Sequence, residues 1–455
     1  AMPDRTGAAR RRRFCAAAVV LLLPACSLIG PDAEQVRVCR MAVPALEPAG
    51  TRIALSGARR GEEPNTVRLD YRASLSGGGG ADRFVLCRFL AEGLSPNKAD
   101  LAGVRTDRGE IAPATVYLLK RYYLDTPEAL ASDPGPGDPT ENLPRMPAPA
   151  AYAAEQVLVA LPRIAIYGLL AAAYALVFGL VGRVNLAFGE IAAVGAAAAG
   201  LSVAAAVAAG ASSPASGLAL AIVVALGAAA LHGTVAGTAT FGLVSPRRTQ
   251  ASLIATIGAS IAISEYLRLA GGRVPDWIAP VWNEPWRLAR AGEFVVTLTP
   301  VSVLTSSLGL AAALALVVLM RRSGYGRAWR ALSDDPEAAS LFGIDPRRIA
   351  RLTFGLAGGL AGLSGALVAI QFGALGFAGG FQLGLKALAA AVLGGVGSLG
   401  GAFVGGLAIG LFETLWSAYL PIQGRDLALH AALILVIVLK PDGLFGVPEP
   451  LSAPR

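Results

Sequence analysis

Four charged residues lie at or within strongly apolar stretches of this sequence: Glu190, Glu265, Lys386 and Glu413. An ionised side chain is costly in hydrocarbon, and where one occurs it usually faces a cavity or a partner group. Glu190 lies close to Asn185, and this polar pair favours a functional role over a purely structural pairing. For Glu265 and Glu413 two positions fit equally well: one facing a cavity or a partner group, and one near the membrane interface.

The inventory of reactive residues argues against enzymatic chemistry. The chain has four cysteines and two histidines, and His232 and His430 are too far apart to begin a cluster of metal ligands. The apolar stretches contain neither paired acids nor a nucleophile with a base. The phosphate-binding pattern G-x-x-x-x-G-K-[ST] does not occur in the sequence, so ATP would have to be bound by a partner chain. We therefore expect a chain that is not an enzyme and holds no cofactor or metal.

The charged segment 321–351 lies between two apolar stretches. Pro336 can occupy the first position of a helix, and Glu337 favours its first turn, where the backbone dipoles leave positive charge. Gly343 can take a positive φ, which allows the helix to end there before a second helix begins near Asp345. The sequence thus predicts a compact knob on a membrane surface, made of a short helix, a glycine corner and a second helix.

Two apolar stretches, 182–190 and 386–401, are interrupted by glycines and polar residues. Glycine in a helix interior costs about 1 kcal/mol relative to alanine. Such density indicates either backbones in close contact or helices broken to line a polar cavity, whose freed amides and carbonyls can hold charged groups. The predicted translocation path comprises Asn185, Gly189, Glu190, Lys386, Gly394, Gly395, Gly397, Gly400 and Gly401.

Composition is typical of an integral membrane protein. The chain has 455 residues, of which 54% are hydrophobic and only 15% are charged, whereas soluble domains average about 45–50% apolar and about 25% charged residues. The net charge of +8 comes mainly from arginines in the N-terminal leader and in loops beside apolar stretches. The positive-inside rule accounts for these arginines, which argues against nucleic-acid binding.

The predicted fold is an all-α polytopic membrane domain with about eight or nine apolar spans, some discontinuous, preceded by a small, mainly β exported domain. The predicted apolar stretches are 157–181, 187–208, 216–244, 252–270, 301–320, 352–372, 383–396, 402–420 and 427–439. The seventh is too short to cross a bilayer unaided, so it either crosses with help or re-enters. The basic connections 245–250 and 321–351 are predicted to face the cytoplasm, which places residue 156 outside.

The first 155 residues are of a different kind. Residues 1–30 have the basic and apolar regions of a signal peptide or signal anchor, and Cys26 lies in a lipoprotein-like box where lipidation is one alternative. Residues 31–132 are expected to form the exported, periplasmic domain, with strands near 51–56, 66–74 and 82–89 and one helix near 114–123. Residues 133–155 form a Pro-rich linker to the transmembrane domain 156–446, and 447–455 form a tail.

The exported domain contains only two cysteines, Cys39 and Cys87. An oxidising compartment favours a disulfide between them, and two buried free thiols are the alternative.

Motifs in the membrane part resemble a known family. The pattern E-A-A-x-x-x-G, which contains Glu337, Ala338, Ala339 and Gly343 and precedes Asp345, resembles the coupling loop of ABC import permeases. The stretches VGRVNLAFGEIAAVGA, GRAWRALSDDPEAASLFGID, LKALAAAVLGGVGSLGGAFVGG and LILVIVLKPDGLFG look like the permease subunit of branched-chain amino acid ABC importers. This resemblance covers about 156–446, in the same order. One departure is a phenylalanine at position 188, where that family commonly has histidine.

The resemblance implies an inner-membrane permease subunit of a binding-protein-dependent importer for branched-chain or other hydrophobic amino acids. Its implied partners are a second permease subunit, related or identical, two ATPase subunits that bind the ATP, and a periplasmic solute-binding protein. A urea or amide permease is the first alternative, because that sister family shares much of the pattern and often carries an exported N-terminal extension. An ion-coupled secondary transporter is the second. In that case Glu190 could carry a proton, but the E-A-A motif would have no role.

Overall fold

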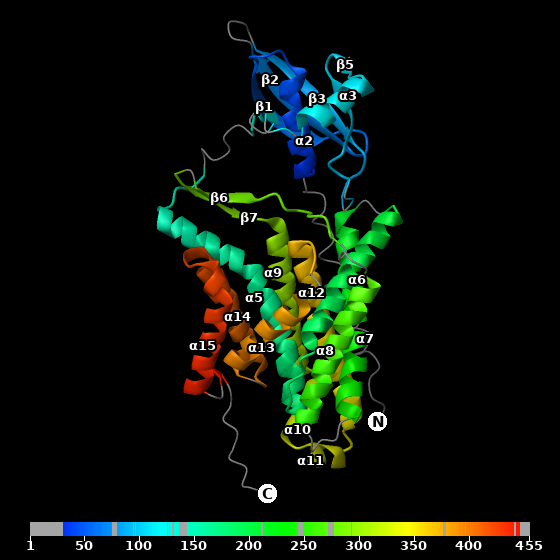
Figure 1. Cartoon of the computed structure of the whole chain (residues 1–455), viewed down its shortest axis with the longest axis vertical. Coiled ribbons are helices and arrows are strands. Elements are labelled where there is room, and N and C mark those ends of the chain that lie inside the picture. The colour runs from blue at the N-terminus through cyan, green and yellow to red at the C-terminus, as the bar shows by residue number, and fades with distance from the viewer. Residues whose placement is uncertain are drawn as a thin grey trace, which may run out of the picture. The chain divides into compact units, whose positions relative to one another are not determined.

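The computed structural model divides the chain into two compact units, Ala1–Asp138 and Pro139–Arg455 (Figure 1). The described residues are 31–74, 80–93, 95, 97–124, 126, 128–129, 132–135, 143–210, 213–243, 249–271, 277–292, 294–375, 379–395, 397–440 and 443–445. The predicted leader, Cys26, most of the connection 245–250 and the tail 447–455 lie outside these residues.

The N-terminal unit is built on a five-stranded antiparallel sheet whose strand order follows the sequence. Its strands are β1 (Arg52–Arg60), β2 (Thr66–Ser74), β3 (Ala81–Phe89), β4 (Leu101–Thr106) and β5 (Gly109–Glu110). Side chains alternate across a strand, so that Val67, Leu69 and Tyr71 of β2 are buried on one face while the intervening positions are more exposed. This face carries the hydrophobic core of the unit.

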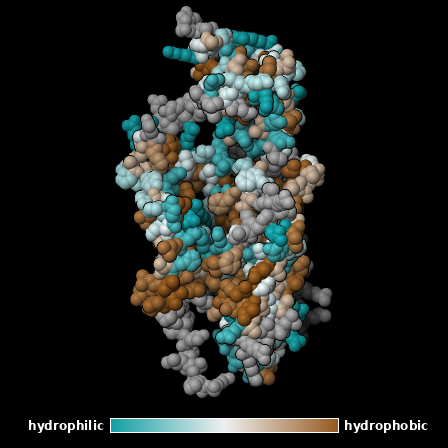
Figure 2. Space-filling model, viewed as in Figure 1, coloured by the Kyte–Doolittle hydropathy of each residue, from teal (hydrophilic) through white to brown (hydrophobic). Residues whose placement is uncertain are grey.

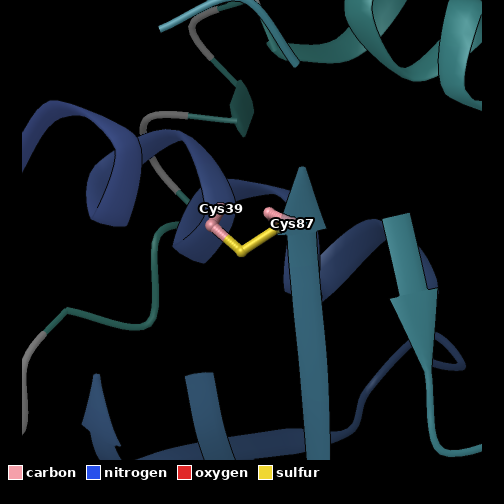
Figure 3. Close-up of a disulfide and its surroundings, with 2 residues drawn as sticks. All are labelled: Cys39 and Cys87. Atoms are coloured by element: carbon pink, nitrogen blue, oxygen red, sulfur yellow. A yellow bond between two sulfur atoms is a disulfide. The ribbon is translucent and has the colours of Figure 1, made fainter. Parts of the chain in front are cut away.

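Two α-helices, rather than the single one predicted, accompany the sheet. These are α2 (Ala33–Leu46) and α3 (Pro113–Leu119), which continues into the π-helical turn η2 (Lys120–Leu124). The sequence prediction missed α2, which is capped by Asp32 and buries one face against β2 and β3. Cys39 of α2 and Cys87 of β3 form a disulfide, shown in Figure 3.

The membrane unit contains eight helices that are long and apolar enough to cross a bilayer, in the part of the chain that the structure describes. Seven of these spans are α5 (Ala148–Val181), α6 (Phe188–Ala208), α7 (Pro214–Leu243), α8 (Thr249–Ala270), α9 (Pro300–Arg322), α12 (Pro346–Phe372) and α14 (Leu399–Tyr419). The last one combines the 3₁₀ turn η3 (Ile422–Gly424) with α15 (Arg425–Leu439). The seventh predicted stretch forms α13 (Gly379–Gly394), which is shorter. The prediction of a polytopic helical membrane protein is confirmed.

Two details of the membrane unit differ from the sequence prediction. Residues 148–155, assigned to the linker, form the first turns of α5 instead. The connection between α8 and α9 contains a hairpin, β6 (Trp286–Ala291) and β7 (Phe294–Leu298), that was not predicted. Glu155 fastens this hairpin to α5, because its carboxylate accepts hydrogen bonds from the amide and hydroxyl of Thr297 at 2.6 and 3.0 Å.

Helix α12 lies at the centre of the bundle and contacts α5, α6, α7 and α9. Its glycines permit this, because a Cβ at Gly362 or Gly365 would clash with α7 or with the backbone of α6. By contrast, α15 exposes large apolar side chains such as Leu427 and Val438. Figure 2 shows hydrophobic residues gathered over the lower part of α15. The bundle is therefore packed through small residues inside and presents an apolar exterior.

Candidate functional site

The segment 323–345 forms a knob at one end of the bundle, and we use that name for these residues. It contains α10 (Gly324–Asp334) and α11 (Pro336–Leu341). Asp335 caps α11 by accepting hydrogen bonds from the amides of Glu337 and Ala338 at 2.9 and 3.0 Å. Gly343 has a φ of +82°, and Asp345 then caps α12. The local geometry is the short helix, glycine corner and second helix that the sequence predicts.

The tip of the knob carries two exposed large apolar side chains. Leu341 and Phe342 are each 88% exposed, whereas Ala339 of the E-A-A motif is buried and Ala338 is half-buried. The sequence prediction did not single out this pair, although two adjacent apolar residues within a charged segment were a usable signal. Exposed large apolar residues rimmed by polar ones are typical of a protein docking surface.

The knob is fastened to the end of α5. The indole of Trp329 is buried and donates a hydrogen bond to the carbonyl of Leu176 at 3.2 Å. The hydroxyl of Ser333 donates to the carbonyl of Gly179 at 2.6 Å. Gly179 is also close to the break between α13 and α14, because a Cβ there would lie 3.7 Å from the carbonyl oxygen of Gly397. A displacement of the knob would therefore act on α5 first and on this break next.

The first predicted break separates α5 from α6. Helix α5 ends at Gly182, which has a φ of +66°. The side chain of Asn185 is buried and accepts a hydrogen bond from the amide of Ala187 at 3.0 Å. Asn185 thus stabilises the turn that starts α6. Gly189 lies in the first turn of α6, where a Cβ would clash with the backbone of α13.

Glu190 lies behind this turn, against α13. It is only 2% exposed, and its Oε2 atom would be 2.7 Å from a Cβ placed on Gly380. Within the described residues, this oxygen has no hydrogen-bond partner. Phe188 packs edge-on against the ring of Tyr174, at 5.4 Å between ring centroids. One unpaired carboxylate oxygen, that of Glu190, thus faces an otherwise apolar, glycine-lined contact of α5, α6 and α13.

The second break separates α13 from α14. Gly395 and Gly397 have φ angles of +109° and +91°, which L side chains rarely adopt, and the hydroxyl of Ser398 caps α14. Gly394 and Gly401 touch through their backbones, whereas a Cβ on Gly400 would meet nothing within 4 Å. The segment after α15 covers the end of α13, because the amide of Phe445 donates to the carbonyl of Gly394 at 3.0 Å.

Lys386 belongs to an ionic cluster among α5, α13, α14 and α15. Its ammonium lies 2.5 Å from the carboxylate of Glu413 and 3.2 Å from that of Asp426. Glu413 is buried and also accepts a hydrogen bond from the hydroxyl of Tyr167 at 2.5 Å. Arg425 lies 3.7 Å from the same carboxylate. These contacts give Lys386 and Glu413 a structural pairing within the bundle.

Glu265 is exposed and pairs with Arg268, one turn along α8, at 2.6 Å. Among the residues described, no three His, Cys, Asp or Glu side chains are arranged to hold a metal ion.

Comparison with known proteins gives a family for the membrane unit. Residues 157–439 match the family described as branched-chain amino acid transport system / permease component. The chain is 33% identical over 287 residues to the high-affinity branched-chain amino acid transport system permease protein LivH of Escherichia coli K12, covering 62% of this chain and 92% of that protein. It is 28% identical over 292 residues to the corresponding protein BraD of Pseudomonas aeruginosa, with the same coverage. No solved structure matches.

Proposed function

This chain belongs to the family of branched-chain amino acid transport permease components, and we propose that it is a permease subunit of a binding-protein-dependent ABC importer. The observation that carries this proposal is the knob, whose tip exposes Leu341 and Phe342 while its base is fastened to α5. A surface of this kind suits docking into a cleft of a partner protein. The partner would be the ATPase, two copies of which would supply ATP binding and hydrolysis.

The proposed mechanism couples the knob to the two breaks. Closure of the ATPases would displace α10 and α11, and the hydrogen bonds of Trp329 and Ser333 would transmit that displacement to the end of α5. The glycines at the second break can then change their backbone angles without side-chain clashes. Rocking of the broken helices would open a path from the middle of the bilayer toward the cytoplasm, as in other membrane transporters with interrupted helices.

Branched-chain or other hydrophobic amino acids are the proposed substrates. The printed names of the relatives support this class, and the Ala- and Gly-rich helices would give such side chains an apolar path. The unpaired oxygen of Glu190 and the hydroxyl of Tyr174 are polar groups on that path that could meet an ammonium group. Substrate selection would rest mainly with the periplasmic binding protein. A urea permease remains the alternative, and uptake competition between leucine and urea separates the two.

The proposed topology places the knob in the cytoplasm and the N-terminal unit in the periplasm of a bacterial inner membrane. The arginines of the knob and of its flanking helix ends support this orientation through the positive-inside rule. The disulfide of the N-terminal unit supports an oxidising compartment for that unit. A second permease subunit, related or identical, would complete the pathway.

The double variant Leu341→Asp/Phe342→Asp tests the coupling role. We expect uptake and co-purification of the ATPase to be lost, because two charges would have to be buried at the docking surface. Leu90→Asp, at an exposed leucine of the N-terminal unit, is the matched control and should leave both unchanged. Normal uptake by the double variant would contradict the proposal.

Glu190 is the observation that favours the second candidate, an ion-coupled transporter, because a buried acid can carry a proton. The variant Glu190→Gln in proteoliposomes distinguishes the two. Glutamine keeps an oxygen that can accept a hydrogen bond from an ammonium group but cannot carry a proton, so an ATP-driven importer should still accumulate substrate, with weaker substrate binding, when ATP and the partners are supplied. An ion-coupled transporter should lose uptake driven by a proton gradient.

A further inference from the structure

A groove of about 870 Å³ runs along the outside of the bundle between α7 and α12. Its wall on α12 extends from Arg348 to Leu360 at the spacing of one helical face. At 1.5 Å per residue this wall is about 18 Å long, roughly the depth of one leaflet in a hydrocarbon core of about 30 Å. Small residues leave the space open, and a Cβ on Gly227 of α7 would meet nothing within 4 Å.

Charge is confined to one end of this groove. Arg348 and Arg351 are both exposed and lie one turn apart at the start of α12, beside the knob. The residues that line the groove include no acid. The one other polar side chain there, Thr234, donates its hydroxyl to the carbonyl of Ala230 at 2.8 Å. The groove therefore combines an apolar channel with two positive charges at the end where a spanning helix leaves the membrane.

We propose that this groove is a binding site for an anionic phospholipid. An acyl chain would lie along the small residues of α7 and α12, and the phosphate would lie between the guanidinium groups of Arg348 and Arg351. Guanidinium donates paired hydrogen bonds to phosphate oxygens, and basic pockets between transmembrane helices bind anionic headgroups. A phospholipid carries its phosphate at the end of its acyl chains, which matches a groove that is apolar along its length and has its two positive charges at one end. The site is independent of the transported substrate.

The first test removes the charges. The full-length protein, purified with its partner subunits, is titrated with phosphatidylglycerol or phosphatidylcholine, and bound lipid is measured by native mass spectrometry. Arg348→Gln/Arg351→Gln should weaken phosphatidylglycerol binding about tenfold or more, because two basic contacts with the headgroup are lost. Phosphatidylcholine binding should change little. The control Arg321→Gln/Arg322→Gln removes two exposed charges at the end of α9 and should bind both lipids as the unaltered protein does.

The second test fills the channel and keeps the charges. Gly227→Leu should reduce binding of both lipids, whereas Gly258→Leu, at an equally open position on α8, should not. Both variants should elute from gel filtration like the parent protein, because a Cβ at either position meets nothing within 4 Å.

Equal phosphatidylglycerol binding by the arginine double variant and the parent would overturn the proposal. It would also fail if a cysteine introduced by Gly227→Cys formed cross-links to the second permease subunit while no lipid bound, since the groove would then be a subunit interface.

Discussion

The closest contacts in the two units involve different atoms. In the N-terminal unit, large side chains such as Leu69 and Tyr71 are buried between the sheet and its helices. In the membrane unit, backbones touch at glycines: Gly195 faces Gly362, and Gly365 faces the backbone of α6. The membrane unit also buries large side chains such as Phe188 and Leu169, but its helices meet in addition through their backbones at glycines.

The solvent explains this difference. In water, burying apolar surface stabilises a fold by about 25 cal/mol per Å², so large apolar side chains are favoured in a core. In lipid, helices gain no such free energy by associating, and close backbone packing and polar contacts hold them together instead. Substitutions should therefore act in opposite senses. The N-terminal unit should be sensitive to the loss of atoms and cross-links, and the membrane unit to the addition of atoms.

The largest effect is expected for Gly365→Leu. A Cβ at this position would overlap the carbonyl of Ala192 on α6, and a backbone atom cannot move aside as a side chain can. We expect the variant to lose the monodisperse peak of the folded protein in detergent gel filtration. Gly258→Leu, which adds the same atoms in open space, should elute normally. A folded Gly365→Leu protein would contradict the view that contact of backbones holds α6 and α12 together.

The next effect concerns buried charge in the membrane unit. Lys386→Met leaves the buried carboxylate of Glu413 with the more distant Arg425 as its cation, and removing one partner of a buried pair costs about 3–5 kcal/mol. The double variant Lys386→Met/Glu413→Leu removes both charges and should recover most of that loss. Thermal unfolding in detergent measures both.

A pair in the N-terminal unit provides the contrast. Arg72 and Asp82 form an ion pair on the exposed surface of the sheet, and such pairs contribute at most about 1 kcal/mol. Arg72→Met should therefore leave the unfolding temperature nearly unchanged. If Lys386→Met also leaves the unfolding temperature nearly unchanged, the ionic cluster around Glu413 is not buried in the functional protein.

Loss of the disulfide is expected to have an effect between those of Lys386→Met and Arg72→Met. Cys39 and Cys87 are 48 residues apart, and losing a disulfide from a small exported domain costs about 2–5 kcal/mol, because the unfolded chain is no longer constrained. Cys39→Ser/Cys87→Ser should lower the unfolding temperature of the N-terminal unit and leave that of the membrane unit unchanged. Equal unfolding temperatures for the oxidised and reduced parent protein would show that the bond does not stabilise the unit.

Features set by neighbouring residues were predictable. The apolar stretches predicted nine helices of the membrane unit, because lipid requires each span to satisfy its own backbone hydrogen bonds. Their bounds agree within a few residues except at the polar starts of α5 and α12, which begin at Ala148 and Pro346, well before the predicted 157 and 352. The corner at Gly343 and the start of α12 after Asp345 also follow from local capping. Helix α2 was missed because only one face of it is apolar, and that face is recognised only against the sheet it covers.

Sequence alone determined that this chain is a polytopic helical membrane protein with a glycine-interrupted bundle and a charged knob, because hydropathy and capping act over a few neighbouring residues. The tertiary structure decided which charges are paired. Lys386 meets Glu413 across 27 residues of sequence, whereas Glu190 keeps an unpaired oxygen. Tertiary structure also decided that Leu341 and Phe342 lie exposed at the tip of the knob. Pairing and exposure depend on how helices from distant parts of the chain pack, which no local pattern specifies.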